Sequence, residues 1–279
     1  MPNATRLGIF DTTEGVRIAW REDGPPPRPG TPCGFFWLSG FRSDMSGTKA
    51  EAIAAHAAAA GRPCFRFDYS GHGESGGDLA GGTISGWLAE AVQAFSTLAG
   101  GPRIVVGSSM GGWLALLLLR RLGSTDPDAA ARIRGLVLIA PAADMTTLIW
   151  DRLSDATRRE ITAQGCCLEP SRYGPEPYLY TLALIEDGRR HLLLQQGLDL
   201  SCPVRILQGD QDPDVSYDHV LRTFHALRGD DIRLTLIKGG DHRLSTPRDI
   251  AFLVATIEAL AHDCDGARSQ STSAASPSR

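Results

Sequence analysis

Short apolar runs alternate with longer amphipathic stretches along most of this chain. The short runs are rich in β-branched and aromatic residues and are typical of buried strands, whereas the longer stretches carry apolar residues at helical spacing. We expect strands at residues 34–41, 63–69, 103–106, 135–140, 204–207 and 232–237, and helices at 48–60, 84–99, 217–227 and 247–262, with a further Leu-rich helix after residue 109. Thr48 and Glu51 have the spacing of a capping box at the start of their helix. The alternation predicts an α/β fold in which a mainly parallel central sheet carries helices on both faces.

The two ends of the chain and one internal segment depart from this alternation. Residues 6–20 contain two short extended patterns, which predict an antiparallel hairpin at the edge of the sheet. Residues 144–199 combine mixed helical patterns with proline interruptions, so we expect a helical insertion above the sheet that serves as a lid; an ordinary extra layer of helices is the alternative. We therefore predict one domain over residues 1–262 and, because Ser, Ala and Pro dominate the remaining residues, a disordered tail over residues 263–279.

Composition and charge argue against several classes of partner. The 279 residues are 42% hydrophobic and 22% charged, which is ordinary for a folded globular protein, and a net charge of −4 gives no basic surface for nucleic acid. The apolar run at residues 113–119 ends at Arg120, far short of the length that a bilayer requires, so we expect no membrane span. The first residues lack the pattern of a secretory signal, and we expect a cytoplasmic location. The six cysteines have no metal-binding spacing, and we expect neither a metal nor a cofactor.

The strand predicted at residues 103–106 leads into a Gly-x-Ser-x-Gly pattern formed by Gly107, Ser109 and Gly111. A helical pattern follows at once, and this is the context of a nucleophile elbow, in which a serine on a sharp strand-to-helix turn exposes its hydroxyl above the sheet. The two glycines leave room for such a turn. Ser109 is therefore a candidate nucleophile. Because the pattern is short, an ordinary loop or helix start is the alternative.

A serine nucleophile needs a histidine base and a carboxylate that orients the histidine. In doubly wound hydrolases these groups follow in the order Ser, Asp or Glu, His. His242 follows the last predicted strand and a Gly-Gly pair, which makes it the candidate base, while His72 lies in a glycine-rich loop ahead of the serine and is the rival. The candidate acids Asp210, Asp212 and Asp214 share one loop after a predicted strand, and the residues alone do not separate them.

Acyl transfer to a serine also needs an oxyanion hole, in which two donors face the carbonyl oxygen as charge develops on it. The backbone N–H of Met110 directly follows the candidate nucleophile and is one expected donor. The second donor should come from the loop after the first buried strand, where we expect the N–H of Phe41.

Several longer strings point to one family. They are Gly-Ser-Ser-Met-Gly-Gly-Trp at 107–113, Arg-Phe-Asp-Tyr-Ser-Gly at 66–71, Cys-Pro-Val-Arg at 202–205 and Asp-His-Arg at 241–243. Together they resemble the α/β-hydrolase family of the mitochondrial palmitoyl-protein thioesterases, also called mycophenolic acid acyl-glucuronide esterases. The resemblance implies the α/β-hydrolase fold and a triad of Ser109, Asp212 and His242, with Asp212 set by the family pattern Gly-x-x-Asp-x-x-Val. Ser216 departs from the family's proline after that valine, and the lack of a mitochondrial targeting pattern favours a bacterial, cytoplasmic relative.

These features predict a serine hydrolase that cleaves carboxylic esters or thioesters through an acyl-enzyme. The expected substrates are small-molecule acyl esters or thioesters, with S-acylated proteins as further candidates. Trp150, Tyr173, Tyr178 and Tyr180 in the predicted insertion suggest an apolar acyl pocket, and ordinary packing is the alternative. Two alternatives stay open on the same fold: an acyltransferase that uses an acceptor other than water, and a ligand-binding protein without catalysis.

Overall fold

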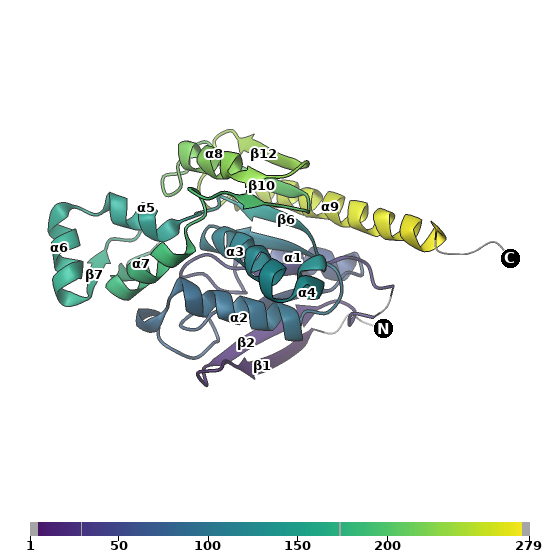
Figure 1. The fold of residues 1–279 in the computed structure, drawn as a ribbon, viewed down its shortest axis with the longest axis horizontal. Coiled ribbons are helices and arrows are strands. Elements are labelled where there is room, and N and C mark those ends of the chain that lie inside the picture. The colour runs from purple at the N-terminus through teal and green to yellow at the C-terminus, as the bar shows by residue number, and fades with distance from the viewer. Residues whose placement is uncertain (1–4, 29, 173, 275–279) are drawn as a thin grey trace.

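The computed structural model describes residues 5–28, 30–172 and 174–274. Within these residues an eight-stranded sheet forms the centre of the molecule (Figure 1). From one edge to the other its strands are β1 (Arg6–Asp11), β2 (Arg17–Asp23), β4 (Cys64–Phe67), β3 (Gly34–Leu38), β5 (Arg103–Ser108), β6 (Ile133–Ile139), β10 (Val204–Gly209) and β12 (Ile232–Ile237). The β1–β2 and β2–β4 pairs are antiparallel, and the other neighbouring pairs are parallel. The predicted edge hairpin and mainly parallel sheet are confirmed.

Helices cover both faces of this sheet, as the alternating pattern predicted. One face carries α1 (Thr48–Ala59) and α9 (Pro247–Ala274), and the other carries α2 (Ile84–Thr97), α3 (Met110–Thr125), α4 (Pro127–Ala131) and α8 (Tyr217–Ala226) (Figure 1). Along β5, Ile104 and Val106 pack into the first layer, whereas Val105 packs into the second. β5 is thus buried on both faces, which is why its sequence is a continuous apolar run. In the described part of the chain, no helix is both long and apolar enough to cross a membrane.

The segment that follows β6 projects from one end of the sheet (Figure 1, left). It contains α5 (Met145–Arg152), α6 (Asp155–Gln164), β7 (Cys166–Glu169), β8 (Tyr178–Thr181), α7 (Leu182–Gly188) and the short helix η2 (Arg189–His191). The strands β7 and β8 pair antiparallel and form a hairpin that the purely helical prediction for this segment did not include. Smaller elements elsewhere are η1 (Leu79–Gly81) and the parallel pair β9 (Leu198–Asp199) and β11 (Leu227–Arg228).

Two sequence predictions at helix ends differ from the structure. The capping box does not form: Gly47 is the N-cap of α1, without a side-chain hydrogen bond, and the Glu51 carboxylate instead accepts a hydrogen bond from Arg66 at 2.7 Å. The disordered tail predicted from residue 263 is wrong as far as residue 274, because α9 continues to that residue. The continuation is held by Asp265, whose carboxylate accepts hydrogen bonds from the Cys33 N–H at 2.8 Å and from Arg62 at 2.7 Å. Residues 275–279 lie outside the described residues.

A buried ion pair joins β2 to β5. Arg103 is fully buried, Glu22 is 2% exposed, and the Arg103 Nη2 donates to Glu22 Oε1 at 2.6 Å. The other guanidinium nitrogens donate to the carbonyl oxygens of Phe35, Pro63 and Gly100. A buried pair satisfied in this way adds little net stability, but removal of Glu22 would leave the charge of the fully buried Arg103 uncompensated and would be strongly destabilising. The pair therefore fixes how the antiparallel edge of the sheet meets its parallel centre.

Glu90 on α2 is a buried acid. In the described structure, no Lys, Arg or His side chain donates a hydrogen bond to its carboxylate. It is 5% exposed, and its Oε2 accepts the Ser70 N–H at 2.9 Å. Burial raises the pKa of the Glu90 carboxyl to about 7.

We predict that Glu90→Gln removes a pH-dependent loss of stability. The Glu90 carboxyl keeps its proton up to about pH 7 in the native state, whereas in the unfolded chain it has its ordinary pKa of 4.5. The raised pKa therefore contributes stability that is full below pH 4.5 and is lost as the pH rises through 7. Across that window the wild-type protein should lose about 3 kcal/mol relative to the variant, since the pKa rises from 4.5 to about 7 and one pKa unit corresponds to about 1.4 kcal/mol. Urea unfolding of both proteins at the two ends of the window measures this difference. Equal pH dependence in both proteins would contradict the prediction.

Candidate active site

Ser109 occupies the turn between β5 and α3, at the carboxyl end of a central strand. Its backbone has φ 54° and ψ −116°, a conformation that a residue with a side chain rarely adopts. The Ser109 N–H donates to the Ile139 carbonyl at 2.8 Å, and the Ser109 carbonyl accepts from the Gly112 N–H at 2.9 Å. These bonds hold the turn that raises the hydroxyl above the sheet, which is the geometry of a nucleophile elbow.

The glycines on either side of Ser109 are required by close backbone approach. A Cβ on Gly107 would lie 2.2 Å from the Gly111 carbonyl oxygen, and a Cβ on Gly111 would lie 2.0 Å from the Leu38 carbonyl oxygen. Both distances are far below van der Waals contact with a backbone that cannot move away easily. The Gly-x-Ser-x-Gly pattern thus reflects the packing of β3, β5 and the start of α3.

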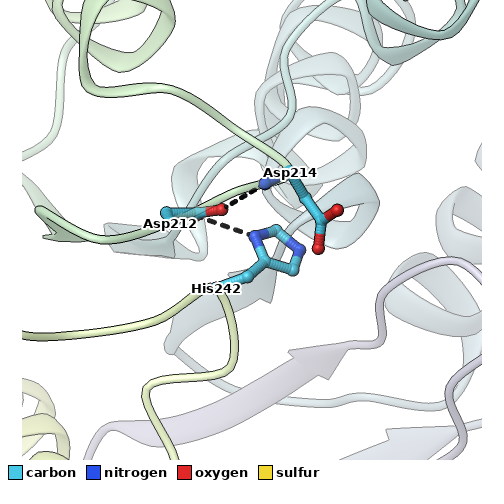
Figure 2. Close-up of side chains that lie close together, drawn as sticks. All are labelled: Asp212, Asp214 and His242. Carbon is cyan, nitrogen blue, oxygen red and sulfur yellow. Dashed lines mark hydrogen bonds and ion pairs between the residues drawn. The ribbon is translucent and has the colours of Figure 1, made fainter. Parts of the chain in front are cut away.

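The structure brings the three side chains predicted for the triad into contact. His242 Nε2 lies 3.0 Å from Ser109 Oγ, and His242 Nδ1 lies 2.8 Å from Asp212 Oδ2. Asp212 comes from the loop after β10 and His242 from the loop after β12. Figure 2 shows the imidazole ring beside the Asp212 carboxylate, with Nδ1 facing it. His242 can therefore accept a proton from Ser109 on one nitrogen while the other is held by a carboxylate.

Asp212 is buried and held as an anion. Its side chain is fully buried, and its Oδ1 accepts the backbone N–H groups of Asp214 at 2.8 Å and Val215 at 2.9 Å. Gln208 Nε2 donates to Oδ2 at 3.1 Å. Burial raises the pKa of the Asp212 carboxyl, but the hydrogen bonds and the charge of His242 outweigh burial and hold that pKa below its usual value.

The other two acids of this loop lie differently. Asp210 accepts the Gly239 N–H and the Lys238 ammonium, both at 2.6 Å, so it fastens the end of β10 to the turn after β12. Asp214 lines the cavity beside His242, and its backbone carbonyl accepts a hydrogen bond from Arg152 of α5 at 3.1 Å. The structure thus separates the three acids: in the described residues only Asp212 has a hydrogen bond to the histidine, and Asp212 is the acid that the family resemblance implied (Figure 2).

Asp212, Asp214 and His242 also form a group that could hold a metal ion, because one ligand atom from each lies within 4.8 Å of the others (Figure 2). Both Asp212 oxygens, however, already accept two hydrogen bonds each from the groups named above. A cation would have to displace these donors. The arrangement therefore fits an acid that orients an imidazole better than it fits a metal ligand.

The two residues predicted to supply oxyanion donors flank Ser109. Met110 is the first residue of α3, and helix N-terminal N–H groups have no partner within their helix. Phe41 follows Gly40, and a Cβ on Gly40 would lie 3.4 Å from the Ser109 Cβ, so this loop runs directly against the serine. Both backbones are thus beside the site where a carbonyl oxygen would lie.

Asp68 supports this loop, and it was not among the residues predicted from the sequence. It lies directly after β4 and is 1% exposed. Its Oδ1 accepts the Met45 N–H at 2.6 Å and its Oδ2 accepts the Glu74 N–H at 2.8 Å, so it joins the Phe41 loop to the glycine-rich loop. The structure requires glycine at position 73, where φ is 47° and a Cβ would lie 2.0 Å from Asp68 Oδ2. The spacing of an aspartate after a strand and a glycine five residues later could have indicated this bridge.

His72, the rival base, lies elsewhere. It is 5% exposed, its Nδ1 lies 3.0 Å from the Ser70 carbonyl, and its ring packs edge-on against Phe41, Tyr69 and Trp87. Burial lowers the pKa of this imidazole. The ring therefore packs behind the Phe41 loop, and the histidine that contacts Ser109 is His242.

A cavity of about 450 Å³ lies over Ser109 and His242. Its walls come from the Phe41 loop, from the loop after β10 that carries Asp212 (the acid loop), and from the segment after β6. That segment contributes Met145, Leu148, Ile149, Arg152, Tyr178 and Tyr180. Tyr178 and Tyr180 therefore line the cavity, as expected, and Tyr173 lies outside the described residues. Trp150 instead packs beneath the guanidinium groups of Arg158 and Arg189, at 5.8 and 5.5 Å.

The fold and this site define an α/β hydrolase, and comparisons with known proteins agree. Residues 37–163 match the family model described as serine aminopeptidase, S33. The chain is 35% identical to mouse palmitoyl-protein thioesterase ABHD10, mitochondrial, over 81% of this chain and 74% of the relative, and 33% identical to the human protein over 81% and 72%. The chain belongs to the α/β-hydrolase family that includes palmitoyl-protein thioesterase ABHD10.

Two solved structures resemble the whole molecule. A putative hydrolase from Agrobacterium vitis S4 has a TM-score of 0.86 at 43% identity, and it matches 93% of this chain and 99% of that one. The mouse α/β hydrolase domain-containing protein 10 has a TM-score of 0.81 at 31% identity, with the same coverage. The resemblance stated from the sequence and the predicted fold class are therefore confirmed, and the protein is a hydrolase.

One expectation is corrected by these relatives. The sequence led us to expect a cytoplasmic location, but the mouse and human relatives are named as mitochondrial proteins, which contradicts that expectation.

We predict that Gly111→Ala lowers stability by about 3 kcal/mol or more, because the new Cβ would collide with backbone atoms that are part of the packed core. Gly123→Ala on the same helix α3 is the matched control, since a Cβ there meets nothing within 4 Å. Alanine favours a helix over glycine by about 1 kcal/mol, so this control should be neutral or stabilising. Thermal unfolding followed by circular dichroism measures both changes. A Gly111→Ala protein as stable as its control would refute the packing argument.

Proposed function

We propose that the protein is a serine hydrolase that cleaves carboxylic esters or thioesters through an acyl-enzyme. The observation that carries this proposal is the continuous set of contacts from Ser109 Oγ through His242 to the buried Asp212 carboxylate. A serine hydroxyl is a weak nucleophile at neutral pH, and such a set supplies the base and the charge that stabilises the resulting imidazolium.

In the first half of the reaction, His242 Nε2 takes the proton of Ser109 as the Oγ attacks the carbonyl carbon. The oxygen of the tetrahedral intermediate receives hydrogen bonds from the N–H groups of Met110 and Phe41. His242 then gives its proton to the leaving alcohol or thiol, and the acyl group remains on Ser109. In the second half, His242 activates a water molecule that attacks the acyl-enzyme, releases the carboxylic acid and restores the serine.

The cavity over Ser109 has both apolar and charged side chains in its lining. Met145, Leu148 and Ile149 give it an apolar wall, while Lys49 and Arg243, the residue after His242, are cationic groups of its lining. We place the acyl group against the apolar wall and the leaving group toward these cationic groups. Since the named relatives are palmitoyl-protein thioesterases, acyl thioesters, including those of S-acylated proteins, are the substrates to test first. Residues 144–199 would then act as the lid that shields the acyl-enzyme.

Ser109→Ala should lower kcat for p-nitrophenyl esters by at least about 10⁴-fold, because it removes the nucleophile while the fold is kept. The same change should abolish covalent labelling by a fluorophosphonate probe. Ser108→Ala, at the neighbouring residue of the same turn, is the control and should keep labelling. Hydrolysis at the wild-type rate by Ser109→Ala would defeat the proposal, whatever the control shows.

The assignment of the acid has its own test. Asp212→Asn should lower kcat by about 10⁴-fold, the size of effect seen when the orienting carboxylate of a triad becomes an amide. Asp210→Asn and Asp214→Asn should each cost less than about tenfold, because neither carboxylate has a hydrogen bond to the imidazole in the described structure. Steady-state kinetics on one ester compares the three variants. Similar losses in all of them would show that the acid has been misassigned.

A further inference from the structure

The loop that carries Phe41 contacts the β7–β8 hairpin through the side chains of two consecutive residues, Phe41 and Arg42. The Phe41 ring stacks on Tyr178 and Tyr180 of β8, with centroid distances of 6.1 and 6.0 Å and interplanar angles of 24° and 22°. The two tyrosine rings are themselves nearly parallel, at 5.9 Å and 5°. The expected oxyanion residue is thus packed against a wall that belongs to a different part of the chain.

Arg42 makes the second attachment. Its Nη1 donates to the carbonyl oxygens of Pro177 at 2.6 Å and Glu176 at 3.3 Å, and its Nη2 donates to the Glu176 carboxylate at 3.0 Å. The guanidinium carbon also lies 5.2 Å from the centre of the Tyr178 ring, within the range of a cation–π contact. Two of these bonds go to backbone oxygens, so they fix the path of the hairpin and do not depend on the exposed Glu176 side chain.

The backbone of Arg42 is strained where these contacts meet. Its φ is 58°, in the left-handed region that residues with a side chain rarely occupy. Such a conformation persists only where the surroundings fix it. Here the Ser43 N–H donates to the Gly40 carbonyl at 3.1 Å and closes the turn around Phe41 and Arg42, and the guanidinium contacts with residues 176–178 tie that turn to the hairpin.

Small displacements of this loop matter because it runs so close to the nucleophile. A Cβ on Gly40 would lie 3.4 Å from the Ser109 Cβ and 3.3 Å from the Ser108 carbonyl oxygen. An oxyanion donor acts only when it is placed at hydrogen-bond distance from the developing charge, and a misplacement of about 1 Å can cost about 10²-fold in rate. A change in the contact with the hairpin therefore changes the oxyanion hole.

We propose that Arg42 is a positioning residue that fastens the Phe41 loop to the β7–β8 hairpin, so that the oxyanion donor is in place only when the hairpin is docked. This inference rests on the proposed serine-hydrolase function. It makes the hairpin part of the catalytic apparatus for every substrate, including those too small to touch it.

The test is the kinetics of Arg42→Ala on p-nitrophenyl acetate, whose two-carbon acyl group gains little from an acyl-binding wall. We expect kcat to fall about 10- to 100-fold with KM within about twofold, because the loss is in transition-state stabilisation. The rate of labelling by a fluorophosphonate should fall in parallel, since its phosphoryl oxygen uses the same N–H groups. Arg42→Lys, which can still donate to one carbonyl, should recover part of the loss.

Glu176→Gln is the matched control, because it removes the ion pair with Arg42 but keeps both backbone acceptors; its kcat should stay near that of the wild type. Tyr178→Leu removes the ring that both Phe41 and Arg42 contact and should lower kcat as Arg42→Ala does. This variant and Arg42→Lys carry the test if Arg42→Ala does not fold, as judged by circular dichroism.

The outcomes separate this inference from the proposed function. If wild-type and Arg42→Ala proteins share the same kcat and labelling rate, or if only KM rises, the positioning role is overturned while the serine-hydrolase function stands. If the wild-type protein neither hydrolyses esters nor reacts with the fluorophosphonate, the proposed function fails and this inference fails with it.

Discussion

The turn at Ser109 is the constraint on which the site depends. Its left-handed backbone costs about 1–3 kcal/mol, and it persists because the surroundings leave no alternative. The Ser109 N–H and carbonyl are both used in hydrogen bonds to neighbouring backbone, and Gly107 and Gly111 allow strand and helix to approach more closely than any Cβ would permit. The free energy that offsets the strain comes from burial of β5 and α3, so the core of the protein holds the nucleophile in position.

The other functional side chains reach Ser109 because neighbouring parallel strands end at one edge of the sheet. β10 and β12 lie beside each other, and the loops that follow them are held by contacts with other elements. Asp210 joins the ends of these two strands through Lys238, and the Lys49 ammonium donates to the Arg243 carbonyl, next to His242. Burial, together with the nearby charge of Arg243, lowers the pKa of Lys49 to about 8. The geometry of the site therefore depends on contacts among the loop after β10, the loop after β12 and the start of α1, which are far apart in the sequence.

The segment after β6 adds a different kind of constraint. Its hairpin has a hydrogen-bonded and stacked contact with the Phe41 loop, and its helix α5 reaches the acid loop through Arg152. It also supplies the apolar wall of the cavity. One inserted segment thus touches both the loop expected to carry the oxyanion donor and the loop that carries Asp212. Its conformation and that of the site are coupled by direct contacts.

The sequence by itself determined the features that depend on local chemistry. Alternation of apolar runs and helical patterns predicted the layered α/β fold, and the glycines around Ser109 predicted the elbow, because backbone space and side-chain periodicity are written into neighbouring residues. For the acid, the local residues alone left the choice open and the family resemblance pointed to Asp212; the tertiary structure gives the physical reason, since Asp210 and Asp212 have different distant partners. The two short strands of the β7–β8 hairpin lie near each other in the chain, but the mixed pattern of that segment did not reveal them. The bridge from Asp68 and the extension of α9 depend on partners far along the chain, which only long-range packing brings together.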